Sequence, residues 1–108
     1  MPCIVKYAYG VCLGQFTTGW DLHRVQTALI DNTVTGITIE ELERSDGEPS
    51  HYALATRTLW LERAARPEAT ATSEDLERWD AELARAVEAL DVTPEARPMW
   101  LWCAERYY

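Results

Sequence analysis

Histidine and cysteine are the residues of this chain best suited to bind a metal or to act as nucleophiles, and they are few. A zinc site needs about four ligands that converge, and these usually come in short spacings such as Cys-x-x-Cys. No such spacing occurs here, so we expect neither a metal nor a cofactor. The cysteine number is odd and without a framework spacing, which favours free thiols in a reducing cytosol. The histidines and cysteines of the chain are His23, His51, Cys3, Cys12 and Cys103.

Nucleophilic catalysis needs a cysteine or serine beside a base. We expect His23 on the exposed flank of a helix, next to Arg24, and His51 at the start of a strand just after a turn. Neither histidine has a recognisable partner in the sequence. We therefore assign no catalytic residue and predict that the chain is not an enzyme.

Two patterns that could indicate nucleotide binding are incomplete. Gly10, Gly14 and Gly19 fall between a predicted strand and a predicted helix, but their spacing matches neither the dinucleotide fingerprint nor the phosphate loop. Aromatic residues on predicted strands are typical of some RNA-binding sheets, yet the basic-aromatic motif of those proteins is missing. A net charge of −8 also disfavours phosphate binding. We expect no direct contact with nucleic acid.

Acidic residues carry the strongest functional signal, because they are concentrated in two segments. Residues 38–50 hold five acids against one arginine, and residues 73–95 hold eight against two. Such a field repels nucleic acid and anionic membranes and attracts basic protein surfaces. A solvated helix face is the alternative explanation. The candidate partner-binding acids are Glu74, Glu77, Asp80, Glu82 and Glu88 on a helix, and Glu43 and Asp46 on a hairpin.

Aromatic residues give a second signal, since five tryptophans and five tyrosines exceed the needs of a small core. Trp100 and Trp102 alternate along the last predicted strand and therefore share one face of it. If that face is exposed, it is a candidate interface, because tryptophan and tyrosine are enriched at binding hot spots. The alternative, that both rings point under the helices, stays open.

The elements that position these residues follow from periodicity and turn signals. Gly10 is expected to be a bulge or bend in the first strand, Thr18 and Ser73 to cap helices, and Asn32 to end the first helix. Residues 39–44 fit either strand or a short helix; we favour strand, because the next segment supplies its hairpin partner. The predicted order is strand 3–9 or 3–13, helix 19–31, strand 33–44, turn 45–50, strand 51–62, loop 64–72, helix 73–90 and strand 99–107.

Apolar spacing predicts which side of each helix faces the core. The second helix has the clearer stripe and the first a shorter one. The stripe of the second helix turns the acids of 73–90 outward. The predicted core positions are Leu76, Trp79, Leu83, Val87 and Leu90 on the second helix, and Leu22, Val25, Leu29 and Ile30 on the first.

The element order βαββαβ predicts an α+β, ferredoxin-like fold with a four-stranded antiparallel sheet and both helices on one face. In that fold the first and last strands are neighbours, which brings the stretch around Cys3 near that around Cys103. The length predicts a single domain, residues 1–108. No apolar run is long enough for a membrane span, and no secretory signal is recognised.

We therefore expect a small acidic protein-binding module in the cytoplasm that engages the basic surface of a nucleic-acid-binding protein. Arginine-rich, lysine-poor composition favours a bacterial or bacteriophage source. Small size, acidity and missing motifs are similar to anti-CRISPR proteins, which suggests an inhibitor or nucleic-acid mimic. One alternative is a ferredoxin-like α/β-barrel homodimer that binds or converts a small molecule, with His51, His23 and Tyr9 as its first polar groups. Another is a structural accessory subunit or antitoxin-like partner.

Overall fold

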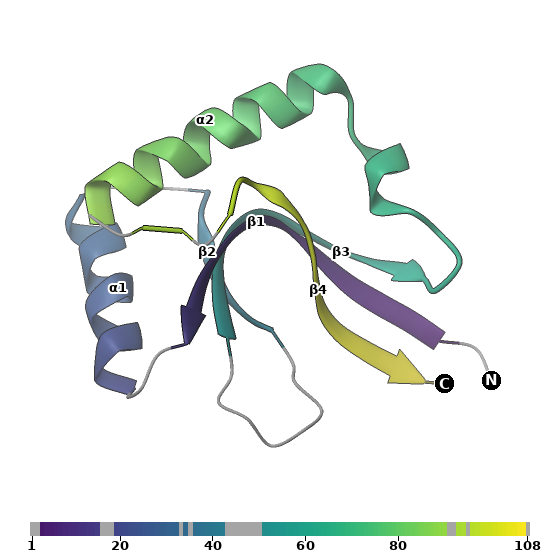
Figure 1. The fold of residues 1–108 in the computed structure, drawn as a ribbon, viewed down its shortest axis with the longest axis horizontal. Helices are drawn as coiled ribbons and strands as arrows, with labels where there is room; N and C mark the ends of the chain where they lie inside the picture. Colours follow the sequence, from purple (N-terminus) through teal and green to yellow (C-terminus); the bar gives the residue numbers. More distant parts are fainter. Residues whose placement is uncertain are drawn as a thin grey trace.

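The computed structural model describes residues 3–15, 19–32, 34, 36–42, 51–90, 93–94 and 96–107. Together they form a mixed α+β fold of four strands and two helices (Figure 1). The elements are β1 (Cys3–Gln15), α1 (Gly19–Asp31), β2 (Thr38–Leu42), β3 (His51–Glu62), the 3-10 helix η1 (Pro67–Thr70), α2 (Ser73–Leu90) and β4 (Met99–Tyr107).

Most predicted elements are confirmed. Both helices and the strands 51–62 and 99–107 have the predicted bounds. The strand predicted at 33–44 is observed at Thr38–Leu42, and the described residues 34, 36 and 37 before it are not in a strand. The first strand runs to Gln15, further than predicted. The predicted loop 64–72 contains η1. The predicted turn at 45–50 and the cap at Thr18 lie outside the described residues.

The strands form one antiparallel sheet in the order β2-β3-β1-β4. The first and last strands are neighbours, as predicted, with Cys3 opposite Tyr107 and Tyr9 opposite Trp100. Register shifts interrupt the ladders at Tyr9/Gly10 and Cys12/Gly14 of the β1–β3 pair and at Lys6/Tyr7 of the β1–β4 pair. Bulges of this kind bend strands and increase their twist.

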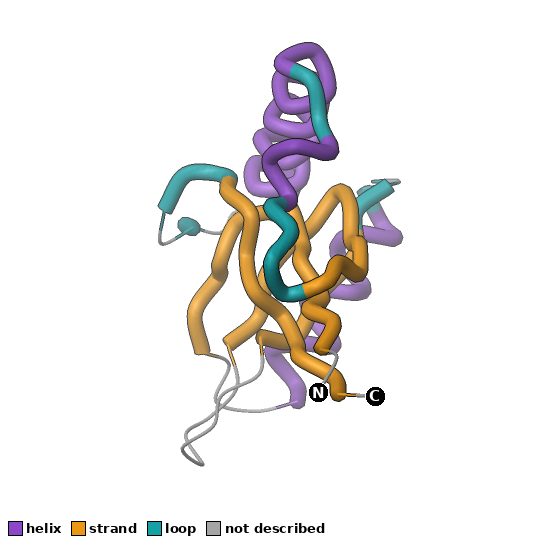
Figure 2. The backbone as a smooth tube through the Cα atoms, turned by 90° about the vertical axis from the view of Figure 1, so that its right-hand side faces the viewer, coloured by secondary structure: helices purple, strands orange, loops and turns teal. Residues whose placement is uncertain are grey.

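The sheet is consequently strongly curled, with α2 running along its outer, convex side (Figure 1). Figure 2 shows the strands as a curved layer with α2 above it. The curl brings β2 and β4 into contact although they are the two edges of the sheet. Lys6 of β1 and Glu40 of β2 also meet, with 2.9 Å between Nζ and Oε2. One member of the acidic segment 38–50 is thus neutralised by this lysine.

Both helices pack on the same face of the sheet, as predicted. Their buried side chains share one core cluster with Tyr9, Val11 and Leu54 of the sheet. The stripe of α2 is confirmed, since two of its members are buried and the other three pack against the cluster. The core residues from the helices are Val25 and Leu29 of α1 and Trp79, Leu83 and Ala86 of α2; Leu76, Val87 and Leu90 flank them.

The prediction for Ile30 is wrong, because 78% of this residue is exposed. Neighbouring helical positions point about 100° apart. Leu29 takes the inward direction at this turn of α1, so Ile30 faces outward. The helix ends as predicted: the backbone N–H of Asn32 donates to the Ala28 carbonyl at 3.0 Å, and its side-chain amide donates to the same oxygen at 2.8 Å. The side chain of Leu22 lies outside the described residues.

The opposite, concave face of the sheet is lined by small side chains. Ala8, Ala55 and Cys103 are buried together there, with Leu42 of β2 packed against them. Small residues at these positions let β2 and β4 approach each other across the curl. The face away from the helices is therefore, around this cluster, a closed interior and not an open aromatic surface.

Candidate functional site

The outer face of α2 is the most strongly charged surface of the described residues. Glu74, Glu77, Asp80 and Glu88 are exposed there, whereas Glu82 is half-buried. The helix begins at Ser73, and the residue that caps it lies one position before the predicted Ser73 cap. Thr72 is the N-cap: its Oγ1 accepts from the Asp75 N–H at 3.1 Å, and its own N–H donates to Asp75 Oδ2 at 3.0 Å. These hydrogen bonds to Thr72 hold the pKa of Asp75 below its usual value.

The charge of α2 is unevenly distributed around the helix. Arg78 and Arg85 lie on one side, and Arg78 donates to Asp75 at 3.0 Å. On the other side, Glu77 and Glu88 are separated only by the exposed alanines 81 and 84, at spacings that align them along the axis. Within the described part of the chain, no cation lies within salt-bridge distance of Glu74, Glu77 or Glu88. We call these three residues the acidic flank.

An apolar groove of about 380 Å³ lies along α2. One wall is α2 itself, where Asp80, Ala84 and Val87 follow the next row of the helix surface. The floor and the other wall come from the sheet and from the segment before β4. The full lining is Val11, Asp80, Leu83, Ala84, Val87, Pro94, Ala96, Arg97 and Pro98.

Asp80 is tied to the core. The Tyr9 hydroxyl donates to Asp80 Oδ1 at 2.6 Å. The Tyr9 ring lies 5.6 Å from Trp79 and 5.2 Å from Trp100, and the two indoles are 6.1 Å apart. We call these three rings the aromatic cluster. Burial and the Asp80 carboxylate raise the pKa of Tyr9 above its ordinary value. Asp80 therefore holds α2 on the sheet as well as adding charge.

Tyr9→Phe is expected to lower the free energy of unfolding by about 1–2 kcal/mol, because it removes a hydrogen bond to a charged acceptor. The pKa of Tyr9 is higher in the folded than in the unfolded state. The stability that the Tyr9 hydroxyl contributes is therefore fully present below the ordinary tyrosine pKa of 10.0 and is lost as the pH rises beyond that value. Urea unfolding at about pH 8 and about pH 10.5 measures this difference.

The difference in the free energy of unfolding between wild type and Tyr9→Phe should be smaller at the higher pH. Tyr7→Phe is the matched control, because Tyr7 lies on the same face of β1 and its hydroxyl makes no hydrogen bond to the described residues of α2. Equal losses for the two variants would contradict the role given to the Tyr9–Asp80 bond.

The two predicted interface tryptophans occupy different environments. Trp100 is half-buried and packs against the core cluster, so the arrangement in which it points under the helices is the one observed. Trp102 pairs with Tyr7 further along β4 and is 51% exposed. Of the pair, Trp102 is the more exposed. The hairpin candidates Glu43 and Asp46 lie outside the described residues.

The titratable groups offer little chemistry of their own. Among the described residues, no three His, Cys, Asp or Glu side chains lie together as a metal site. Burial, together with the nearby Glu40 carboxylate, raises the pKa of Cys103 to about 11, which keeps this thiol protonated and poorly nucleophilic. The described part of the chain contains no helix whose length and apolarity would allow it to cross a membrane.

No family model, curated protein or solved structure matches this chain. The structure leaves Glu74, Glu77 and Glu88 exposed on one helix, whose next row of side chains lines a groove. It places Trp100 against the core and leaves Trp102 exposed, it ties the exposed Asp80 to Tyr9, and it half-buries Glu82.

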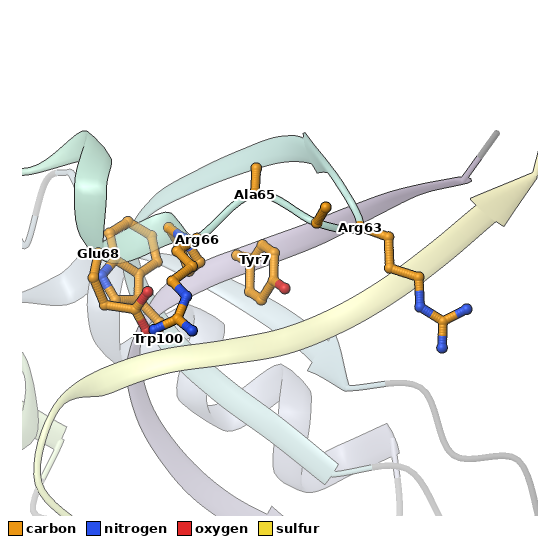
Figure 3. Close-up of a pocket in the computed structure, with 8 residues that line it drawn as sticks. Tyr7, Arg63, Ala65, Arg66, Glu68 and Trp100 are labelled. Carbon is orange, nitrogen blue, oxygen red and sulfur yellow. The ribbon is translucent and has the colours of Figure 1, made fainter.

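Sequence reasoning missed a second concave feature, at the other end of α2. A pocket of about 330 Å³ lies between the 63–68 segment and the sheet (Figure 3). Its lining residues are Tyr7, Arg63, Ala64, Ala65, Arg66, Pro67, Glu68 and Trp100. A signal did exist in the sequence: residues 51–72 carry three arginines against two acids, in a chain whose net charge is −8.

Proposed function

We propose that this protein is a non-enzymatic binding module that engages a basic protein surface through the acidic flank and the apolar groove beside it. The observation that supports this best is that Glu77 and Glu88 are exposed on α2 next to the helix row that lines the groove, with no cation of the described residues within salt-bridge distance of either carboxylate. An acidic rim steers a basic partner, and an apolar groove offers the desolvated contact that stabilises the complex.

The partner that this surface suits best is a nucleic-acid-binding protein, because such proteins present lysine and arginine in grooves shaped for phosphates. Carboxylates fixed on a helix can occupy that groove in place of the phosphates. The sharpest form of the proposal is an inhibitor that works in the manner of anti-CRISPR proteins, in the cytoplasm of a bacterial host.

We also propose a finer description of the fold, as ferredoxin-like. The element order βαββαβ and the central positions of β1 and β3 support it. The curl that brings β2 and β4 together is stronger than an open sheet requires. In this protein the curl serves to close the concave face and to leave the convex side as the binding side.

The test is a matched pair of triple charge reversals. One variant combines Glu74→Lys, Glu77→Lys and Glu88→Lys, which spares Asp80 because of its bond to Tyr9. The control combines Asp31→Lys, Glu62→Lys and Glu68→Lys, three exposed acids that lie off α2. Both variants change the net charge by the same amount, so a difference between them reports on position.

A tagged wild-type chain captures its partner from bacterial lysate at low ionic strength, and mass spectrometry identifies it. The purified partner should bind the acidic-flank variant about 100-fold more weakly than it binds the control. Binding should weaken with salt, and nucleic acid should compete for the same surface of the partner. Equal affinity for the two variants, with both folded by circular dichroism, would refute the proposal.

A further inference from the structure

The pocket at the other end of α2 combines aromatic faces with a guanidinium in a way that the acidic flank does not. Tyr7 of β1 and Trp100 of β4 both line it from the sheet. Arg63, Arg66 and Glu68 come from the segment that leads from β3 into η1. Figure 3 shows Arg66 and Glu68 extending towards the side of the pocket where Trp100 lies, with the Tyr7 ring beside them.

The two arginines have different surroundings. Arg63 Nη1 lies 3.5 Å from Glu105 Oε1, and its side chain points away from the other lining residues (Figure 3). Arg66 is exposed, and no carboxylate of the described residues lies within salt-bridge distance of it. Arg66 is therefore the cation that remains to meet an anion in this pocket.

The lining restricts the chemistry of a ligand. Indole and phenol faces favour a planar ring, and a guanidinium binds a carboxylate in a fixed, often bidentate geometry. Glu68 adds a negative charge that disfavours a doubly charged phosphate and can accept a hydrogen bond from an N–H group. The volume of about 330 Å³ is at the small end for ligand sites, which suits a ligand of one or two rings.

We propose that this pocket binds a small aromatic monocarboxylate that carries an amine or ring N–H. Arg66 holds the carboxylate, Trp100 and Tyr7 contact the ring, and Glu68 accepts from the nitrogen. This site is separate from the acidic flank, so either proposal can fail without the other.

The experiment titrates the full chain with three probes and follows backbone NMR shifts and calorimetric heats. Anthranilate has the ring, carboxylate and amine, benzoate lacks the amine, and phenyl phosphate replaces the carboxylate with a doubly charged group. Anthranilate should bind with a Kd of about 1 mM or tighter, ahead of benzoate and then phenyl phosphate. The shifts should centre on Tyr7, 63–68 and Trp100.

Two exposed arginines provide the matched variants. Arg66→Gln should weaken anthranilate binding at least about tenfold, because it removes the cation. Arg85→Gln, on the outer face of α2, should leave it unchanged. Glu68→Gln should remove the preference for anthranilate over benzoate. It should also raise the affinity for phenyl phosphate, because the repelling carboxylate is gone. The proposal is overturned if no probe shifts the pocket residues, if Arg66→Gln binds as wild type does, or if phenyl phosphate binds best.

Discussion

Gly10→Ala is expected to destabilise the protein by on the order of 3–5 kcal/mol, enough to threaten folding of a domain of this size. A Cβ at this position would lie 1.9 Å from the Leu54 carbonyl oxygen, 2.8 Å from its carbon and 2.9 Å from Ala55 Cα. All three atoms belong to the backbone of β3, so no side-chain rotation can relieve the contact. The β1–β3 pair, at the centre of the sheet, would have to separate.

Gly36→Ala is the matched control. Gly36 has φ 78°, but a Cβ there would have no atom within 4 Å. This substitution introduces only left-handed backbone strain, of about 1–2 kcal/mol. Urea unfolding followed by circular dichroism compares the two variants. A Gly10→Ala protein that unfolds at the same urea concentration as wild type would show that β1 and β3 are not packed this closely.

Gly10 shows how far the sequence alone could go. Its position in a β-branched, aromatic run indicated a bulge, and the register does shift between Tyr9 and Gly10. The run could not reveal that the extra residue of this bulge is Thr56 of β3. Nor could it reveal that the backbone of Leu54 and Ala55 lies too close to Gly10 to admit a side chain. Pairing between distant segments determines such contacts, and local periodicity carries no information about it.

The acids and tryptophans were limited in the same way. The stripe through Trp79 and Leu83 correctly turned the charges of α2 outward, because helical period alone determines direction. Three features escaped prediction because each joins segments far apart in the chain. They are the hydrogen bond from Tyr9 to Asp80, the ion pair of Lys6 with Glu40, and the groove beside Ala84. For Trp100 and Trp102, alternation predicted a shared strand face, but only the position of α2 determines which ring it covers.

Trp79→Ala is expected to be the most damaging truncation in the helices, with a loss of about 3–5 kcal/mol. Trp79 is 6% exposed, contacts both other rings of the aromatic cluster, and has the Arg57 guanidinium carbon 5.6 Å from its ring centroid. Removing the indole leaves a cavity between α2 and the sheet that the neighbouring rings cannot fill without leaving their own contacts. The Tyr9–Asp80 bond, one position along α2, should weaken as well.

Trp102→Ala is the control, because it deletes the same side chain from a residue that is 51% exposed, from the strand that also carries Trp100. We expect a loss below about 1 kcal/mol. Guanidinium unfolding of both variants measures the difference, and near-ultraviolet circular dichroism reports the packing of the rings. If the two truncations cost the same, α2 is not held by the aromatic cluster. The acidic flank and its groove would then lack the fixed position on the sheet that binding a partner requires.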